Sequence, residues 1–382
     1  MIDFLQVFTE LGGGPLTSVI LLIFMLDLQN RWRVIYYSLL VTMTVFIISF
    51  FKMIYEEDRP NWLDPSLTIG QFDCVPEYGN PSGHSLEAAA VSFTLYLDLM
   101  MGFSTRSKKK YLWIYSILFG IFPVAYSFTM GFSRIVLGVH TWNQVIYGWL
   151  LGIWLAFLFT FGVRRRLKKH VSTKLSKLSD KRKMNREQRR CKNLAVTFML
   201  AIVLYGIYIV VFQYKKRDIQ SIASAQALSN IYSQCDESFD INESFQVAVL
   251  KEFSYSVGFF GAELGFIFQL KYFDGQDNVT SPAFNKTAKF WGRLLFLIVI
   301  SAPFEYLVIF SSSSEPLNVV FPKRFIGLFV WQFLLTLLFD FLCMKVKLYD
   351  RFVSVEVAAN SDEGLGRSQH GPERYQRRNN PK

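Results

Sequence analysis

The sequence has 382 residues, of which 51% are hydrophobic and 17% aromatic, including 38 Phe. A soluble core of this chain length needs far fewer apolar residues, so the composition indicates a membrane protein. The net charge of +11 comes from basic residues that cluster in loops between apolar runs and in the C-terminal tail. Membrane topology explains such clusters, which argues against nucleic-acid binding. Four Cys without a CxxC pair argue against a metal cage or a disulfide scaffold.

Apolar runs recur along most of the chain, and we predict an all-α, polytopic transmembrane bundle with about nine spans, each crossing about 30 Å of hydrocarbon. The opening MIDFLQVFTELGGG lacks the features of a cleavable signal peptide, so the first span is expected to act as the insertion signal. Residues 1–345 are predicted to form the membrane domain and 346–382 a disordered cytoplasmic tail. The predicted spans cover residues 17–29, 34–51, 85–102, 112–131, 143–163, 194–212, 247–270, 294–310 and 327–343.

Charge sets the predicted orientation of these spans. Residues 164–193 are rich in Lys and Arg, so the positive-inside rule places this loop in the cytoplasm. Counting spans outward puts the basic loop at 104–110 on the same side. The opposite, luminal side then receives the net acidic segment 55–83 and the short turn 133–141. Residues 215–217, KKR, also fall on the luminal side, against the rule.

Two of the four His stand where chemistry is expected. His84 and His140 each lie beside a predicted span on the luminal side, in short segments rich in residue types that bind phosphate. His170 and His370 lie in the basic loop and the tail, where a solvated surface His is the ordinary interpretation. The three segments that follow therefore carry the functional hypothesis.

The first segment, KMIYEEDRP, places Lys52 and Arg59 where a predicted span leaves the membrane. Their spacing of two helical turns favours one face, and Pro60 disfavours helix at Arg59, so the guanidinium is expected to project from a turn toward the same pocket. A compact ammonium and a forked guanidinium both suit phosphate oxygens. The alternative is a Lys and an Arg that snorkel at a membrane boundary.

The second segment, NPSGHS, immediately precedes an Ala-rich apolar run that is predicted to be helical. The start of a helix offers unpaired backbone N–H groups to an anion. Gly83 permits close approach of the backbone, and Ser82 adds a hydroxyl donor beside His84. The alternative is an ordinary capped helix with an incidental His.

The third segment, SRIVLGVHTWNQ, is a short luminal turn between two spans. Arg134 supplies a third cation. Gln144 lies four residues after His140, so within a helix its amide oxygen accepts the Nδ1 proton and directs Nε2 outward. The alternative is an interfacial His beside Trp142 of an aromatic belt.

Together the segments place Lys52, Arg59, Arg134 and both His on one side of the membrane, without an acid cluster suited to a divalent metal. We therefore expect no metal and no cofactor. The cations and the helix start would neutralise a transferring phosphoryl group. His140 would attack phosphorus in line, and His84 would protonate the leaving oxygen and then take a proton from water, which predicts a bell-shaped pH profile.

The motifs KxxxxxxRP, PSGH and SRxxxxxH, in this order, resemble the type 2 phosphatidic acid phosphatase superfamily, which also includes the vanadium haloperoxidases. The resemblance implies a metal-independent phosphatase built as a helical bundle. The site residues that it implies are Lys52, Arg59 and Arg134 for phosphate, Ser82 and Gly83 for its oxygens, His84 as the acid and His140 as the nucleophile.

Within this superfamily the chain is similar to the glucose-6-phosphatases of the endoplasmic reticulum. The likeness rests on Gln144, where many relatives carry Asp, on the RPNW that closes the first motif, and on Cys74 ten residues before His84. It implies a sugar phosphate such as glucose-6-phosphate as substrate, a place in gluconeogenesis, an endoplasmic reticulum membrane protein with a luminal active site, and a sugar-phosphate transporter as a partner. The C-terminal NNPK departs from the dilysine signal of some animal members.

Other functions use the same motifs. A lipid-phosphate phosphatase, acting on phosphatidate, a sphingoid-base phosphate or a polyprenyl pyrophosphate, would need the same residues and a gap between spans for the lipid tail. A sugar substrate instead predicts a water-open pocket with hydroxyl-binding groups, for which Asn61 and Trp62 are the nearest candidates. A non-catalytic membrane protein that retains the fold is a third hypothesis.

Cys74 and Cys235 both fall on the luminal side, which is oxidising, and we predict a disulfide between them. Two unpaired thiols are the alternative. Cys191 and Cys343 fall at cytoplasmic or membrane positions, where inert thiols are expected.

Overall fold

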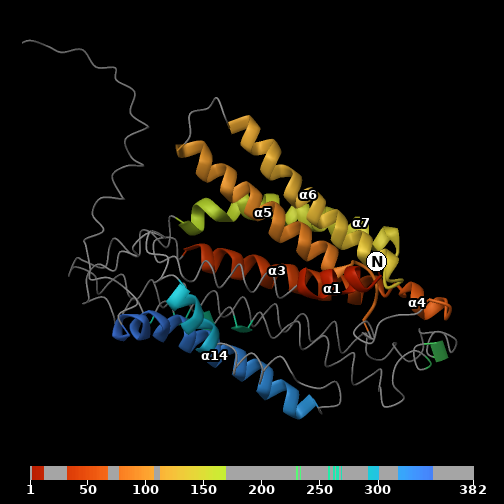
Figure 1. Cartoon of the computed structure of the whole chain (residues 1–382). Coiled ribbons are helices and arrows are strands. Elements are labelled where there is room, and N and C mark those ends of the chain that lie inside the picture. Colours follow the sequence, from red (N-terminus) through yellow and green to blue (C-terminus); the bar gives the residue numbers. More distant parts are fainter. Residues whose placement is uncertain are drawn as a thin grey trace, which may run out of the picture.

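The described part of the protein consists of helices and their connecting turns (Figure 1). Five of the predicted spans coincide with helices: α3 (Trp32–Tyr55), α5 (Gly83–Arg106), α6 (Leu112–Val136), α7 (Trp142–Phe157) with its continuation η4 (Leu158–Val163), and α14 (Leu317–Lys345). Two short helices, α1 (Ile2–Gly12) and α4 (Pro60–Leu63), complete the labelled elements. The computed structural model describes residues 2–12, 32–67, 77–106, 112–168, 291–300 and 317–346, with a few helical residues between 229 and 268.

Within these ranges, three helices are long and apolar enough to cross a membrane, namely Ile35–Leu63, Ser116–Val136 and Trp142–Lys168. The predicted spans at 17–29 and 194–212 lie outside the described residues, as does almost all of the predicted tail at 346–382. The count of about nine spans is therefore still a prediction. The all-α architecture is confirmed for the part of the chain that the structure describes.

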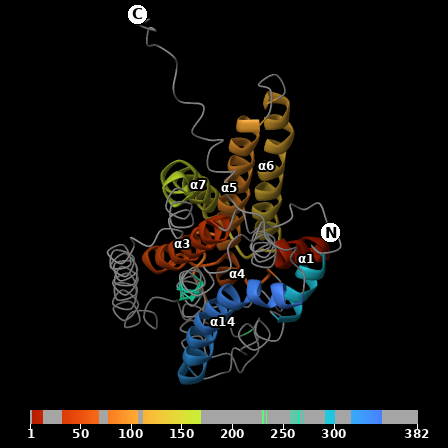
Figure 2. The same ribbon diagram turned by 90° about the vertical axis from the view of Figure 1, so that its left-hand side faces the viewer.

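Helix α5 covers the predicted span at 85–102 but is less apolar than its neighbours. It packs against α3, α6 and α7, and Figures 1 and 2 both show it beside α6. Its polar side chains find partners inside the bundle: Ser92 Oγ donates to the Ala88 carbonyl oxygen at 2.5 Å and lies 3.3 Å from Ser127 Oγ on α6. A central helix surrounded by protein tolerates polar residues that a lipid-facing helix does not.

A buried charge cluster joins three segments at one end of the bundle. Asp98 of α5 is only 1% exposed and forms ion pairs with Arg33 Nε at 2.9 Å and with Arg164 Nε at 2.6 Å. Both guanidinium groups also lie over the Trp32 ring. Because a lone buried carboxylate is costly, these pairs fix the start of α3, the end of α5 and the end of η4 relative to one another.

Small residues let α7 approach α5 very closely. Gly148 and Gly152 form a Gly-x-x-x-Gly pattern on α7, of the kind that packs membrane helices. A Cβ atom added to Gly152 would lie 2.4 Å from the Leu86 carbonyl oxygen and 2.7 Å from the Ala89 Cβ. One added to Gly148 would lie 2.8 Å from the Ser82 carbonyl oxygen. This close approach brings the start of α7 next to the start of α5.

We expect Gly152→Ala to destabilise the protein by about 1–3 kcal/mol, because the added methyl group must push the α5 backbone away. The measurement is thermal unfolding in detergent, followed by size-exclusion chromatography. Gly162→Ala is the matched control, since its Cβ would meet only the Leu158 Cδ1, at 3.7 Å. Equal unfolding temperatures for the two variants would contradict close packing of α5 on α7.

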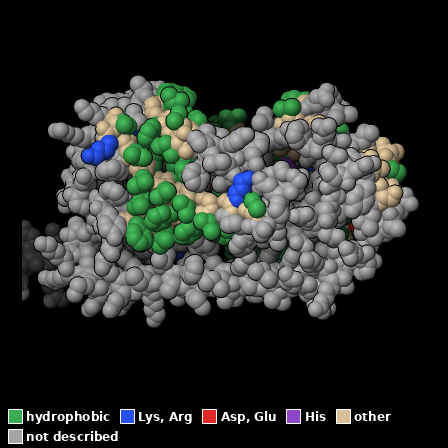
Figure 3. Space-filling model, turned by 90° about the horizontal axis from the view of Figure 1, so that it is seen from below, with side chains coloured by type: hydrophobic (Ala, Val, Ile, Leu, Met, Phe, Trp, Pro, Cys, Tyr) green, Lys and Arg blue, Asp and Glu red, His purple; other side chains and the backbone are tan. Residues whose placement is uncertain are grey.

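Apolar side chains also cover outer surfaces of the bundle. Figure 3, viewed from below, shows hydrophobic side chains gathered over much of the described surface on that face, and α14 lies in the lower part of Figure 1. On α14, Ile326 is 60% exposed and Val319 44%. Exposed apolar surface of this extent suits contact with lipid.

Among the Cys, Cys343 lies buried on α14. The predicted disulfide between Cys74 and Cys235 lies outside the described residues, as does Cys191. The bridge therefore stays a prediction.

Candidate active site

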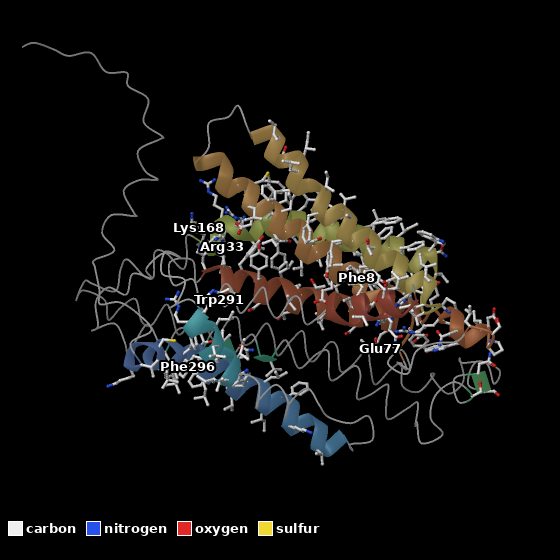
Figure 4. The ribbon with its side chains drawn as sticks, in the orientation of Figure 1. Phe8, Arg33, Glu77, Lys168, Trp291 and Phe296 are labelled. Carbon is white, nitrogen blue, oxygen red and sulfur yellow. The ribbon has the colours of Figure 1, made fainter. Side chains whose placement is uncertain are left out.

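The three predicted segments meet at the end of the bundle opposite the Asp98 cluster. Lys52 lies in the last turn of α3, Arg134 lies in the last turn of α6, and Arg59 directly precedes α4. The side chains of all three are buried. Figure 4 shows Glu77 at this end, while the labelled Arg33 and Lys168 lie at the other. The end of the bundle that holds the candidate site is therefore rich in buried positive charge.

Helix α6 extends further than predicted and changes the setting of the third segment. Arg134 belongs to the helix, not to the predicted turn at 133–141, because α6 continues to Val136. The backbone N–H groups of Val139 and His140 both donate to the Arg134 carbonyl oxygen, at 3.2 and 3.3 Å. Gly138 has a φ of +69°, which favours glycine, and this turn carries the chain back from Arg134 to His140.

The capping of α7 sets the position of Gln144. Thr141 is the N-cap and accepts a hydrogen bond from the Gln144 backbone N–H, while the Gln144 side chain accepts one from the Thr141 N–H at 3.2 Å. This reciprocal capping box holds the Gln144 side chain over the start of the helix. The Gln144 Oε1 lies 3.1 Å from the His140 Nδ1.

The opposite end of the Gln144 amide determines the protonation of His140. Gln144 Nε2 donates to the Asp58 carbonyl oxygen at 3.0 Å and to Glu57 Oε1 at 3.2 Å. A backbone carbonyl and a carboxylate both accept hydrogen bonds, so together they turn the amide nitrogen toward Asp58 and Glu57 and the amide oxygen toward His140. His140 Nδ1 is then the donor, and the unprotonated Nε2 carries a lone pair.

The second segment lies against the first and the third. The Ser82 backbone N–H donates to the Gln144 carbonyl oxygen at 3.0 Å, and Ser85 Oγ donates to Ser82 Oγ at 2.9 Å. Helix α5 begins at Gly83, where an added Cβ would lie 4.0 Å from Lys52 Nζ. The Lys52 ammonium group is therefore next to the N-terminus of a long helix, an arrangement that favours anions.

Two acidic residues, Glu57 and Glu77, complete the site. The sequence alone does not single them out. The Glu77 carboxylate forms an ion pair with Lys52 Nζ, and Arg59 Nε donates to the Glu77 carbonyl oxygen at 2.6 Å. Glu57 accepts from Gln144, as described above. Both acids come from the acidic segment at 55–83, whose local sequence does not distinguish them from its other acids.

Burial and positive charge lower the pKa of both His. For His84 the causes are, in order, burial and the charges of Arg134, Lys52 and Arg59. For His140 they are burial and the same three cations, opposed in part by the hydrogen bond that its Nδ1 donates to Gln144. Both imidazoles are therefore neutral at neutral pH when the site holds no anion.

The residues proposed for sugar hydroxyl groups do not line an open pocket. Asn61 and Trp62 are 3% and 6% exposed. The Trp62 ring packs against Tyr78 with the ring centroids 5.9 Å apart, and its carbonyl oxygen accepts from Asn230 Nδ2 at 2.8 Å. Within the described ranges, no group of three or more His, Cys, Asp or Glu could hold a metal ion.

Comparison with known proteins matches residues 33–168 to the PAP2 superfamily, a range that contains every candidate site residue. The chain is 30% identical over 147 residues to undecaprenyl-diphosphatase of Sulfolobus acidocaldarius, which covers 38% of this chain and 60% of that protein. It is 31% identical over 115 residues to human dolichyldiphosphatase 1, covering 28% and 45%. The chain thus spans about half the length of these curated relatives. No solved structure matches.

Proposed function

We propose that this chain, whose residues 33–168 match the PAP2 superfamily, is a metal-independent membrane phosphatase that acts through a phosphohistidine intermediate on His140. The observation that carries the proposal is the hydrogen-bond chain from His140 through Gln144 to Asp58, which leaves the His140 Nε2 unprotonated beside three buried cations. A neutral imidazole near concentrated positive charge suits attack on an anionic phosphoryl group.

In this proposal the phosphoryl oxygens are held by the cations and by the start of α5. Lys52, Arg59 and Arg134 supply the positive charge, and Ser82 and Gly83 supply donors at the helix N-terminus. Because charge spreads over the oxygens during phosphoryl transfer, fixed donors around them stabilise the transition state.

The reaction then runs in two steps on the two His. His140 Nε2 attacks phosphorus, the bond from phosphorus to the leaving oxygen breaks, and His84 donates a proton to that oxygen. Water then attacks the phosphohistidine, His84 takes the proton from that water, and inorganic phosphate leaves with both His restored. Gln144 keeps the proton on His140 Nδ1 throughout.

The relatives favour a lipid-like substrate over a sugar phosphate. By name they act on undecaprenyl and dolichyl diphosphates, which supports the polyprenyl alternative better than the expected glucose-6-phosphate. The gluconeogenic role and the sugar-phosphate transporter lose their support with it. Helix α6, whose last turn carries Arg134, has exposed apolar side chains such as Ile117 and Ile121, along which a prenyl tail would lie from the bilayer. We propose a polyprenyl diphosphate, hydrolysed on the luminal side of the endoplasmic reticulum membrane.

The experiment that tests this function is phosphate release by purified protein in detergent containing a chelator. A polyprenyl diphosphate, phosphatidate, sphingosine-1-phosphate and glucose-6-phosphate are offered in parallel. We expect the polyprenyl diphosphate to be hydrolysed with the highest kcat/KM. A preference for glucose-6-phosphate would overturn the polyprenyl substrate and support a sugar phosphate. Absence of phosphate release from all four substrates would overturn the phosphatase proposal.

The lowered pKa of His140 predicts where activity declines in acid. His140 attacks only when neutral, and its pKa lies well below the ordinary 6.5, so kcat/KM should persist at pH 6 and decline only at lower pH. On the basic side, His84 is neutral in the free enzyme, so the required proton enters with the substrate. We therefore expect kcat/KM to fall above about pH 6–7, where a phosphate group loses its second proton.

The measurement is the pH dependence of kcat/KM from pH 4 to 9 at constant ionic strength. An acid limb with its midpoint at or above 6.5 would contradict the depressed pKa of His140. The free energy of unfolding, measured at each pH, serves as the control for loss of folded protein in acid.

A further inference from the structure

Glu57 lies in the first of the three segments that form the candidate site, and its side chain contacts the other two. Its Oε1 accepts from Gln144 Nε2 at 3.2 Å, and its Oε2 accepts from Asn80 Nδ2 at 2.7 Å. Its carbonyl oxygen accepts from the Gly79 backbone N–H at 2.7 Å. One residue between α3 and α4 thus joins the segment before α5 to the first turn of α7.

The orientation of the Gln144 amide has a chemical consequence. If the amide turned by 180°, its NH₂ group would face His140 Nδ1, and the imidazole would carry its proton on Nε2. A protonated Nε2 has no lone pair for phosphorus. Whatever fixes the amide therefore selects the reactive tautomer.

Glu57 fixes this amide from the far side. Its carboxylate is an acceptor with negative charge, so it attracts the NH₂ group of Gln144 and repels the amide oxygen. Gly79, held by the Glu57 carbonyl oxygen, closes the space: a Cβ there would lie 2.5 Å from both Gln144 Nε2 and Oε1. Asp58 offers one backbone acceptor in support. The amide is enclosed, and its orientation follows from the acceptors around its nitrogen.

We propose that Glu57 is a positioning residue that acts through Gln144 to hold His140 in the tautomer with the proton on Nδ1 and Nε2 free for attack. The inference rests on the proposed nucleophilic role of His140. It extends the hydrogen-bond chain of His140 and Gln144 to Glu57. The Glu57 carboxylate has no contact with substrate in this proposal.

The direct test is ¹⁵N NMR of histidine-labelled protein in lipid, which distinguishes the two imidazole tautomers. The chain has only four His, so the His140 signals are assigned by their loss in His140→Ala. We expect the wild type to show protonated Nδ1 and unprotonated Nε2, and Glu57→Ala to show a mixture of tautomers. An unchanged tautomer in Glu57→Ala would overturn the proposal. The tautomer measurement does not require catalysis. It therefore tests the role of Glu57 even if the protein hydrolyses none of the substrates offered, which would overturn the proposed function alone.

Conservative replacement provides the matched variant. In Glu57→Gln the new amide oxygen can accept from Gln144, and its NH₂ group can donate to Asn80 Oδ1, which has no hydrogen-bond partner among the described residues. We expect this variant to retain the wild-type tautomer. Asp64→Ala is the control for loss of an acid from the same segment, since Asp64 Oδ1 accepts locally, from the backbone N–H and hydroxyl of Ser66. A tautomer change in Asp64→Ala as large as in Glu57→Ala would count against a specific role.

Kinetics give an independent readout on the active enzyme. We expect Glu57→Ala to lower kcat about 10- to 100-fold, as misplaced reacting groups do, while inhibition by inorganic phosphate changes by less than about threefold. Because Glu57 acts through Gln144, the double variant Glu57→Ala/Gln144→Ala should lose no more activity than Gln144→Ala alone. If the double variant lost activity by the product of the two single losses, or if inhibition by phosphate weakened in parallel with kcat, Glu57 would instead have a general structural role.

Discussion

His140→Ala is expected to lower phosphate release by roughly four orders of magnitude or more, because removing a covalent nucleophile eliminates the intermediate and not only a contact. The variant should fold, since His140 lies in a turn whose backbone hydrogen bonds to the Arg134 carbonyl oxygen do not involve the imidazole. The cations that hold phosphate also stay in place. This variant should therefore still bind inorganic phosphate as an inhibitor while it loses catalysis.

Two measurements establish that result. The first is the initial rate of phosphate release beside the inhibition constant of inorganic phosphate, which should change by only a few-fold. The second is covalent labelling from a ³²P-substrate, quenched in alkali where a phosphoimidazole survives. His370→Ala, in the C-terminal tail, is the histidine control and should label like the wild type. Label that persists in His140→Ala would place the nucleophile elsewhere.

The helices and the site segments follow from local features of the sequence. Runs of apolar residues predict α3, α6 and α7, and Thr141 with Gln144 at N3 forms a capping box that marks the start of α7. The match of residues 33–168 to the PAP2 superfamily agrees with the superfamily that the three motifs resemble. Motifs of this kind are predictable because each sits at a helix end, where chain direction and residue type together determine what the side chain faces.

The acids of the site could not be predicted in the same way. Glu57 and Glu77 become distinct from their neighbours only when α3, α5 and α7 pack together and bring Gln144 and Lys52 within reach. That packing depends on Gly148 and Gly152, whose Gly-x-x-x-Gly spacing is present in the sequence. Burial of Asn61 and Trp62 likewise depends on tertiary contacts, in particular that of Trp62 with Tyr78.

The relatives support the polyprenyl alternative better than the expected sugar phosphate, for a related reason. Gln144 suggested a sugar-phosphate enzyme, yet its contacts are with His140, Glu57 and Asp58, and all of them serve the proposed nucleophile. The residues proposed to bind phosphate would recognise a phosphoryl group whatever it is attached to. Substrate choice must therefore come from surfaces beyond the motifs, such as the apolar face of α6.

His84→Ala is expected to separate the two chemical steps that His140→Ala abolishes together. His84 lies in the first turn of α5, near Lys52, Arg59 and Arg134, whose charges with burial lower its pKa. With the natural substrate the variant should lose about 10²- to 10⁴-fold in turnover, the usual contribution of a general acid or base. With p-nitrophenyl phosphate the leaving group needs no proton, so the first step should survive.

The second step still needs a base to activate water, and no other described His can replace His84 there. Phosphohistidine should therefore accumulate in His84→Ala supplied with p-nitrophenyl phosphate, with a burst of p-nitrophenol that approaches one equivalent per enzyme and then slow turnover. Stopped-flow absorbance measures the burst, and alkaline-quenched ³²P label from the labelled substrate measures the trapped intermediate. Rapid steady turnover without a burst would exclude His84 as the base, whereas loss of both burst and label would make it indispensable to formation of the intermediate even without proton donation.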